Sequence, residues 1–398
     1  MLSWRWSLLL AGEVVAVQPP TVPPYAFRCQ SAFYSTAVPV ESPKTWSCEG
    51  ARVHPISFAI PAEDVVPCVP EKFTDFASLR PGVKDTYIFP MTSFGEMEYK
   101  RMYREARFAV KVRRKGWETM RIYEILASGS LPYIENVDQI PPTALVFVNK
   151  TLLKAAHTLG ARKDGVWPGY ATLAAELLRH TQQHLTTEAL ARYILSASRR
   201  STASKVLYIS HCLHGDYQCY VSLHGLRKVL GSGLVDIPRL DYMYEPRVAA
   251  MRQIKRTMLC PQTSCTVVSG GRGETGKATF DMAGEGMPVA LYGGGFSYAY
   301  RLPELPINRS LSALRRSLAA HEFDAVIFPN TEVAEGQGPR EVRQLVQLVQ
   351  RHYDPKEIIV LDGRDPDPDG RLHAGVAELA AQGFVYFLRE PPSFCKAA

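Results

Sequence analysis

Residues 103–142 carry a strand pattern, a basic turn and a helix pattern in direct succession. Apolar and polar positions alternate over 107–112, which predicts a short buried strand. Apolar residues then recur at helical spacing over 118–127, and Gly129 ends this predicted helix. A second strand is predicted from Leu131 onward. The stretch therefore predicts a βαβ unit whose first loop lies at the carboxyl end of a strand, where open α/β sheets bind ligands.

The loop of this predicted unit is basic. It contains Arg113, Arg114 and Lys115, and Gly116 and Trp117 follow them directly. Glycine gives the backbone the freedom that a tight turn needs. A helix N-terminus beside three cations suits a phosphate group, because unpaired backbone N–H groups and positive side chains both attract negative charge. The loop is therefore a candidate binding site for a ligand that carries phosphate.

Strand and helix patterns continue to alternate along the rest of the chain. In the first half, a strand is predicted at 52–61, a turn and a strand at 81–89, a strand or extended run at 143–148, and helices at 96–105, 152–159, 170–185 and 187–198. In the second half, strands are predicted at 206–210, 235–237, 288–292, 324–328, 357–361 and 384–388, and helices at 220–230, 246–256, 309–320, 339–352 and 371–381. This alternation is typical of a parallel, doubly wound sheet.

A chain of 398 residues is longer than one ordinary hydrophobic core supports, so we expect about two domains. Residues 1–45, rich in Pro, Ser and aromatic residues, are expected to be extended or disordered. A first α/β domain is placed at 46–198 and a second, Rossmann-like α/β domain at 205–398, with a polar, unpatterned stretch between them. The apolar run at 7–11 is too short to span a membrane, which takes about 20 residues. The N-terminus is compatible with a signal peptide, a signal anchor or a truncated start. The sequence therefore leaves open whether the protein associates with a membrane, and whether it lies in the cytoplasm or in the Golgi lumen.

The composition of the chain bears on its binding partners and on the state of its cysteines. The net charge of +7 is mild, and no long basic stripe with interleaved aromatic residues is present, so we expect no nucleic acid partner. The eight cysteines show no repeated C-x-x-C spacing. An even number permits disulfides without requiring them, and we expect most of these cysteines to be free or buried thiols.

The stretch 103–142 resembles the exostosin-type glycosyltransferases, in particular algal and giant-virus members with a pattern close to K-K-G-G-W-D-x-x-R-H-Y-E-I-L-A-x-G-x-x-P-Y-F. The matching residues are Lys115, Gly116, Trp117, Arg121, Tyr123, Glu124, Ile125, Leu126, Gly129, Pro132 and Tyr133. Glu118, Ile122 and Ile134 depart from the pattern, which has Asp, His and an aromatic residue at these positions. A looser similarity extends over most of 46–390.

This resemblance implies two Rossmann-like halves facing a cleft, as in glycosyltransferases of the B fold, with the first half holding a nucleotide-sugar donor. It implies transfer of a sugar to a carbohydrate or glycoprotein acceptor, with no cofactor beyond the donor. Arg121 and Glu124 would face the donor, with the glutamate near ribose or sugar hydroxyls, and the three cations of the loop would neutralise the diphosphate without a metal. In exostosin-type enzymes the donor half ends the fold, whereas here it comes first. The plain alternative is that Arg121 and Glu124 only pair on one helix face.

A general base is needed if the reaction inverts the sugar configuration. His214 and Asp216 are the candidates, because they lie in the loop after the strand predicted at 206–210. Metal binding by this loop is not expected, since the spacing fits no standard zinc site in the cluster His211, Cys212, His214, Cys219 and His224.

Two alternatives to an active glycosyltransferase remain. One is a catalytically degenerate relative that binds carbohydrate or acts as a scaffold, which the departures at 118 and 122 allow. The other is a phosphotransferase with a P-loop at 271–277, centred on Lys277. Ala278 stands where the P-loop needs Ser or Thr, and the residues after it make a poor helix, so a flexible insertion is the preferred interpretation of that segment.

Overall fold

The computed structural model describes residues 44–83, 86, 93–211, 217–244, 264–271, 274–281 and 298–398. Its largest sheet has eight strands. Their order is β13 (Lys396–Ala397), β1 (Trp46–Cys48), β2 (Ala51–Ile56), β12 (Val385–Arg389), β11 (Ile358–Asp362), β10 (Ala325–Phe328), β6 (Val206–Ile209) and β7 (Leu234–Ile237). Neighbouring strands from β2 to β7 are parallel, and β1 pairs antiparallel with both β2 and β13.

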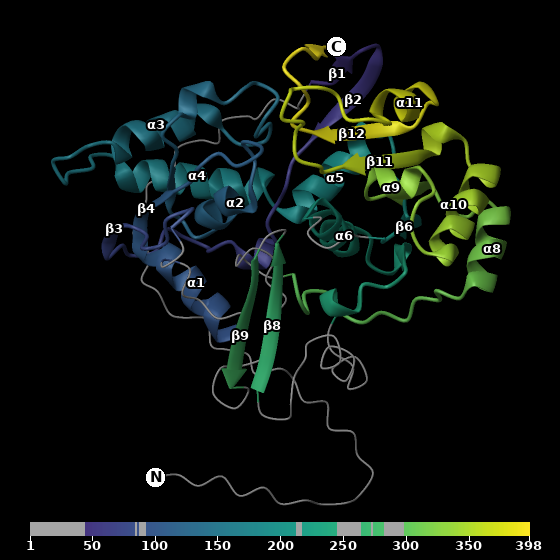
Figure 1. Cartoon of the computed structure of the whole chain (residues 1–398), viewed down its shortest axis with the longest axis horizontal. Helices are drawn as coiled ribbons and strands as arrows, with labels where there is room; N and C mark the ends of the chain where they lie inside the picture. The colour runs from purple at the N-terminus through teal and green to yellow at the C-terminus, as the bar shows by residue number, and fades with distance from the viewer. Residues whose placement is uncertain are drawn as a thin grey trace, which may run out of the picture.

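Helices cover both faces of this sheet (Figure 1). One face packs on α5 (Thr187–Ala197) and α6 (Tyr217–Leu230). The other packs on α8 (Leu311–Ala319), α9 (Thr331–Ala334), α10 (Arg340–His352) and α11 (Val376–Ala381). Alternate residues of each strand enter the two cores, as Leu207 and Tyr208 do in β6, because successive strand side chains point to opposite faces. The predicted α/β class with a parallel sheet is confirmed, and it is compatible with a Rossmann-like fold.

A second, smaller sheet carries the motif. It contains three parallel strands, β3 (Thr74–Phe76), β4 (Ala106–Val110) and β5 (Leu131–Tyr133), and packs with α1 (Ser93–Glu105), α2 (Met120–Ala127), α3 (Lys150–Gly160) and α4 (Tyr170–His184). The predicted βαβ unit is therefore present as β4, α2 and β5. Its core is continuous with the α5–α6 face of the larger sheet, so the two sheets share one hydrophobic cluster. Figure 1 shows this smaller sheet and its helices beside the larger one.

Strand pairing crosses the predicted division of the chain. β1 and β2 lie in the range assigned to the first domain, yet they pair with β13 and β12 of the larger sheet. The segment after β2 then carries the chain over to the smaller sheet. The division into domains itself stays a prediction.

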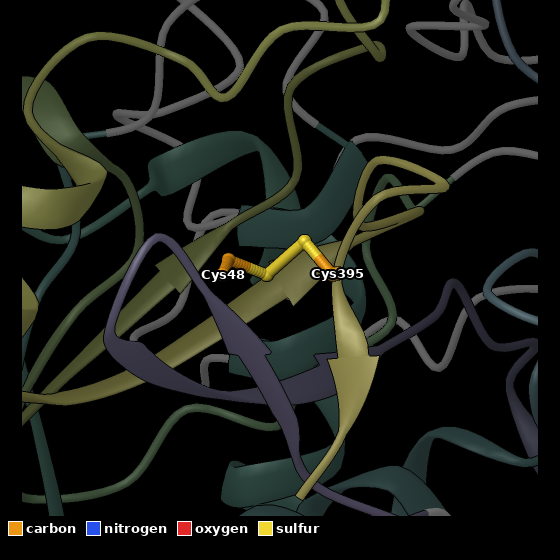
Figure 2. The surroundings of a disulfide bond; sticks show 2 residues. All are labelled: Cys48 and Cys395. Atoms are coloured by element: carbon orange, nitrogen blue, oxygen red, sulfur yellow. A yellow bond between two sulfur atoms is a disulfide. The ribbon is translucent and has the colours of Figure 1, made fainter.

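A disulfide joins Cys48 at the end of β1 to Cys395 just before β13 (Figure 2). Cys68 and Cys219 are also disulfide-bonded, and no cysteine in the described part of the chain is free. The expectation of mostly free thiols is therefore wrong for these four residues, because pairing partners far apart in sequence cannot be recognised from spacing alone.

Some local expectations changed, and others lie outside the described residues. The predicted strand at 143–148 is a series of turns, although Ala144, Leu145 and Val148 are buried. The segment with the P-loop pattern, for which a flexible insertion was the preferred interpretation, forms part of a hairpin, β8 (Ser264–Gly271) and β9 (Glu274–Asp281). Lys277 pairs with Val268 in this hairpin, and β9 continues to Asp281 where a P-loop would begin a helix. The helix expected at 246–256 and the strand expected at 288–292 lie outside the described residues. None of the helices in the described ranges is long and apolar enough to cross a membrane.

Candidate functional site

The basic bend between β4 and α2 lies against the larger sheet, at the end of β12. Glu390 follows β12 directly, and its carboxylate accepts hydrogen bonds from the backbone N–H groups of Trp117, at 3.0 Å, and Glu118. Gly116 allows this close approach, because a Cβ there would lie 2.9 Å from Glu390 Oε1 and 3.0 Å from Pro366 Cδ. The N–H groups ahead of α2 that suit a phosphate are thus bound to a carboxylate of the same chain.

The three cations of the bend lie outside this contact. Arg113, Arg114 and Lys115 are exposed, and the Arg113 guanidinium stacks 5.2 Å from the centre of the Trp117 ring. Lys111 lies beneath the bend and donates to the Trp117 carbonyl; burial lowers the pKa of Lys111 to about 8, against the opposing effect of Glu390 and Glu118. Positive charge therefore remains accessible at the surface of the bend, while its backbone N–H groups are engaged.

Glu124, the glutamate of the motif pattern, is buried in α2 with an exposed fraction of 2%. Its Oε2 accepts a hydrogen bond of 2.8 Å from the Tyr99 hydroxyl of α1. Burial and the charge of Glu124 raise the pKa of Tyr99 well above its usual value, and the half-buried Arg121 opposes this. Arg121 and Glu124 are thus brought together with Tyr99 rather than turned to bulk water.

Two residues from the second half of the chain reach the same region. The Tyr298 hydroxyl donates to the Ala59 carbonyl at 3.0 Å, and burial together with the charges of Asp64 and Glu124 raises the pKa of Tyr298 well above its usual value. Arg301 pairs with Asp64 at 3.0 Å. The site around Glu124 is therefore built from both halves.

Arg301 belongs to a buried network of alternating charges. Asp64, in the 3₁₀ turn Ala62–Asp64, also pairs with Lys100 at 2.6 Å, and both cations pair with Glu96, at 2.7 and 3.1 Å. Although burial alone would raise the pKa of Asp64, Arg301 and Lys100 hold it below its usual range. Removing one partner of a buried ion pair leaves an uncompensated charge, so this network fixes the position of Arg301 against the first half of the chain.

Glu118 is the second buried acid of the motif, with an exposed fraction of 2%. Its Oε1 accepts from the Phe58 backbone N–H at 2.6 Å and from the Tyr123 hydroxyl. Its Oε2 is buried and has no hydrogen-bond partner among the described residues. Burial raises the pKa of Glu118 to about 7; Arg389 opposes this rise and Glu390 adds to it. A carboxyl group of this kind can hold or release a proton near neutral pH.

Gln218, in the first turn of α6, is connected to Glu118 through Gly363 and Arg389. It is fully buried, and both polar atoms of its amide lack a hydrogen-bond partner within the described part of the chain. It packs on Gly363, whose carbonyl accepts from Arg389 at 2.9 Å, and Arg389 in turn lies 3.5 Å from the Glu118 carbonyl. Phe58 lines the same region, since its ring is 4.6 Å from the Arg389 guanidinium. These groups lie at the carboxyl edge of the parallel strands, where α/β sheets bind ligands.

The remaining predicted residues are His214 and Asp216, which lie outside the described residues. Tyr99, Tyr298, Arg301, Gln218, Arg389 and Glu390 were not identified from the sequence. For Arg389 and Glu390 a signal was available, because both are charged and come directly after the strand predicted at 384–388, at the edge of a parallel sheet where ligands bind. For Arg301 and Tyr298 no local pattern pointed to the motif.

Within the described ranges, no group of three or more His, Cys, Asp or Glu side chains is arranged to hold a metal ion. Comparisons of the chain with models of protein families, with curated proteins and with solved structures found no match.

Proposed function

We propose that the protein is a glycosyltransferase that moves a sugar from a nucleotide-sugar donor to a carbohydrate or glycoprotein acceptor, with two halves arranged as in the B fold. The observation that carries this proposal is the position of Glu124. The acid of the exostosin-like motif is buried where Tyr99 of the first half and Tyr298 of the second approach it. A buried carboxylate among hydroxyl groups is well suited to hydrogen-bond the hydroxyls of a ribose or a sugar.

The cations around this acid supply the other requirement of sugar transfer. The leaving nucleoside diphosphate gains negative charge in the transition state, and fixed cations stabilise that charge. Arg121 lies on the same helix as Glu124, and Arg301 approaches from the second half. In this proposal Arg121 and Glu124 position the nucleoside or sugar, and Arg113, Arg114 and Lys115 attract the diphosphate. His214 and Asp216 stay candidates for action on the acceptor.

One observation favours a second candidate, a degenerate glycosyltransferase-like protein that binds carbohydrate or acts as a scaffold. Glu390 occupies the N–H groups of Trp117 and Glu118 that would otherwise hold a phosphate. A diphosphate at that position would have to displace this carboxylate. A protein that no longer uses a donor would tolerate the contact permanently.

Calorimetric titration with uridine diphosphate and guanosine diphosphate tests donor binding. We expect one of them to bind the wild type, and Arg121→Ala and Glu124→Gln each to weaken binding by about 10-fold or more, the cost of losing one charged hydrogen bond. Arg162→Ala is the control, since Arg162 forms an exposed ion pair with Asp164 in the loop between α3 and α4. No binding by the wild type, or equal binding by all four proteins, would contradict the site.

A further inference from the structure

Resting on the proposed transfer reaction, we infer that Glu118 is the catalytic proton acceptor and that Gln218 holds the acceptor hydroxyl beside it. Neither role was expected from the sequence, where Glu118 is a departure from the family pattern. The inference begins with two buried side chains whose hydrogen-bonding capacity the fold does not use.

The two oxygens of Glu118 have different surroundings. Oε1 is fixed by the Phe58 N–H and the Tyr123 hydroxyl, so the carboxyl group cannot rotate freely. Oε2 has no partner in the described part of the chain. A buried polar atom without a partner costs free energy, so its presence in a native site points to a ligand or an ordered water. One oxygen thus orients the group, and the other is left to receive a proton.

Gln218 supplies a second group of the same kind. Its amide offers both a donor and an acceptor, and neither is engaged within the described residues. A hydroxyl can accept from the amide nitrogen while it donates to the carboxylate. Two residues link the surroundings of Gln218 to those of Glu118. Arg389 donates to the carbonyl of Gly363, on which Gln218 packs, and to the carbonyl of Glu118. Phe58 donates its backbone N–H to the Glu118 carboxylate, and its ring packs against the ring of Tyr217, the residue before Gln218. Because these two residues link the surroundings of both unused groups, we assign Glu118 Oε2 and the Gln218 amide to one site.

The local charge selects the ligand. Arg389 is surrounded by the acids Glu118, Glu390 and Asp365. Its guanidinium pairs with Glu390 at 3.5 Å and with Asp365 at 2.8 Å. Lys111 and Lys150 also lie within the electrostatic reach of Glu118, so the charges around Oε2 nearly balance and do not single out an anion such as phosphate. A neutral hydroxyl of a carbohydrate acceptor meets both the charge and the hydrogen-bonding requirement.

Several neighbours set the proton affinity of Glu118, and the hydrogen bonds from Tyr123 and the Phe58 N–H lower its pKa. Burial dominates and favours the protonated acid, Glu390 acts in the same direction, and Arg389 opposes them, which leaves the pKa at about 7. Burial lowers the pKa values of Lys111 and Lys150, and the negative charge of Glu118 partly offsets this lowering. The hydroxyl of Tyr123 is held protonated, because burial and Glu118 raise its pKa well above the usual value.

The proposed step is balanced as follows. The acceptor oxygen forms a bond to C1 of the donor sugar while its proton passes to Glu118 Oε2. The bond between C1 and the phosphate oxygen breaks, and the nucleoside diphosphate leaves with the electron pair.

The test compares Glu118→Gln, Glu118→Asp and Gln218→Leu in the full, oxidised chain. Release of nucleoside diphosphate from uridine- and guanosine-diphosphate hexoses and pentoses is followed with free mono- and disaccharides as acceptors, from acid to alkaline pH. We expect Glu118→Gln to lower the transfer rate by about 10²–10⁴-fold, the usual effect of losing a general base. Glu118→Asp should restore part of the rate, and Gln218→Leu should raise the acceptor KM. Glu322→Gln, at an exposed ion pair with Lys205, is the control.

A purely structural role for Glu118 would not change the pH profile. In the wild type we expect the rate to rise with pH to a plateau above about pH 7, and Glu118→Gln should lose this rise while it keeps the nucleotide dissociation constant. Transfer by Glu118→Gln at the wild-type rate, or with an unchanged pH profile, overturns the inference and leaves the proposed function standing. A wild type that binds no nucleotide instead overturns the proposed function, and the inference with it.

Discussion

Replacing Glu118 by glutamine removes a buried acid whose pKa is raised from 4.5 to about 7, chiefly by burial. A group whose pKa is raised by folding stabilises the native state while it is protonated. That contribution is fully present below the unfolded-state pKa and is lost as pH rises through the folded-state value. The wild type should therefore become less stable between about pH 5 and about pH 7, relative to a variant that cannot titrate at this position.

The magnitude follows from the two pKa values. A rise from 4.5 to about 7 corresponds to about 3 kcal/mol in total, of which about 2–3 kcal/mol falls between pH 5 and pH 8. Glutamine keeps an oxygen for the Phe58 N–H and the Tyr123 hydroxyl, while its amide nitrogen adds a donor that is unpaired in the buried site. That second effect is independent of pH, so it shifts the whole curve without changing its slope.

Urea unfolding followed by fluorescence, with the disulfides intact, measures this difference at several pH values. The free energy of unfolding of Glu118→Gln minus that of the wild type should rise by about 2–3 kcal/mol from pH 5 to pH 8. Groups that titrate equally in both proteins cancel in the difference. Parallel curves, or a difference that falls with pH, would show that the native protein does not raise the pKa of this carboxyl group.

Two further predictions concern the contacts that hold the bend and the chain ends. Gly116→Ala should lower the free energy of unfolding by about 2–4 kcal/mol. The new Cβ would lie 2.9 Å from Glu390 Oε1 and 3.0 Å from Pro366 Cδ, and it would force the Glu390 carboxylate off two backbone N–H groups. A change within about 0.5 kcal/mol in urea unfolding would contradict this prediction. Cys48→Ser should lower the free energy of unfolding by about 2–5 kcal/mol, because it frees Cys395 and removes a cross-link between distant parts of the chain. An unchanged unfolding midpoint would show that this disulfide does not constrain the unfolded protein.

Local patterns predicted the elements of the motif well. The alternation before the bend became β4, and the helical spacing after it became α2, since both depend on which side chains face a nearby core. The apolar run 143–148 was predicted wrongly because its side chains are buried within turns. An apolar stretch shows that residues are buried, and it does not show which backbone conformation buries them.

The long-range contacts could not be predicted in this way. β2 pairs with β12, more than 300 residues later in the chain, and Glu390 reaches the bend across 273 positions. Nothing in the sequence near Trp117 indicates that its backbone N–H is bound by a carboxylate from the other sheet. The candidate phosphate site was therefore placed on the predicted helix beside the predicted cations, while no local pattern showed that Glu390 binds its backbone N–H groups.

The most direct measurement is the release of nucleoside diphosphate when the purified full chain is incubated with nucleotide sugars and no acceptor. Slow hydrolysis of one donor is expected, because the groups that stabilise the leaving diphosphate also assist attack by water. Glu124→Gln should reduce this release, and Arg162→Ala should leave it unchanged. Absence of release from every donor, with nucleotide binding still present, would contradict catalysis and favour the scaffold alternative, and release that is equal in Glu124→Gln would place the donor elsewhere.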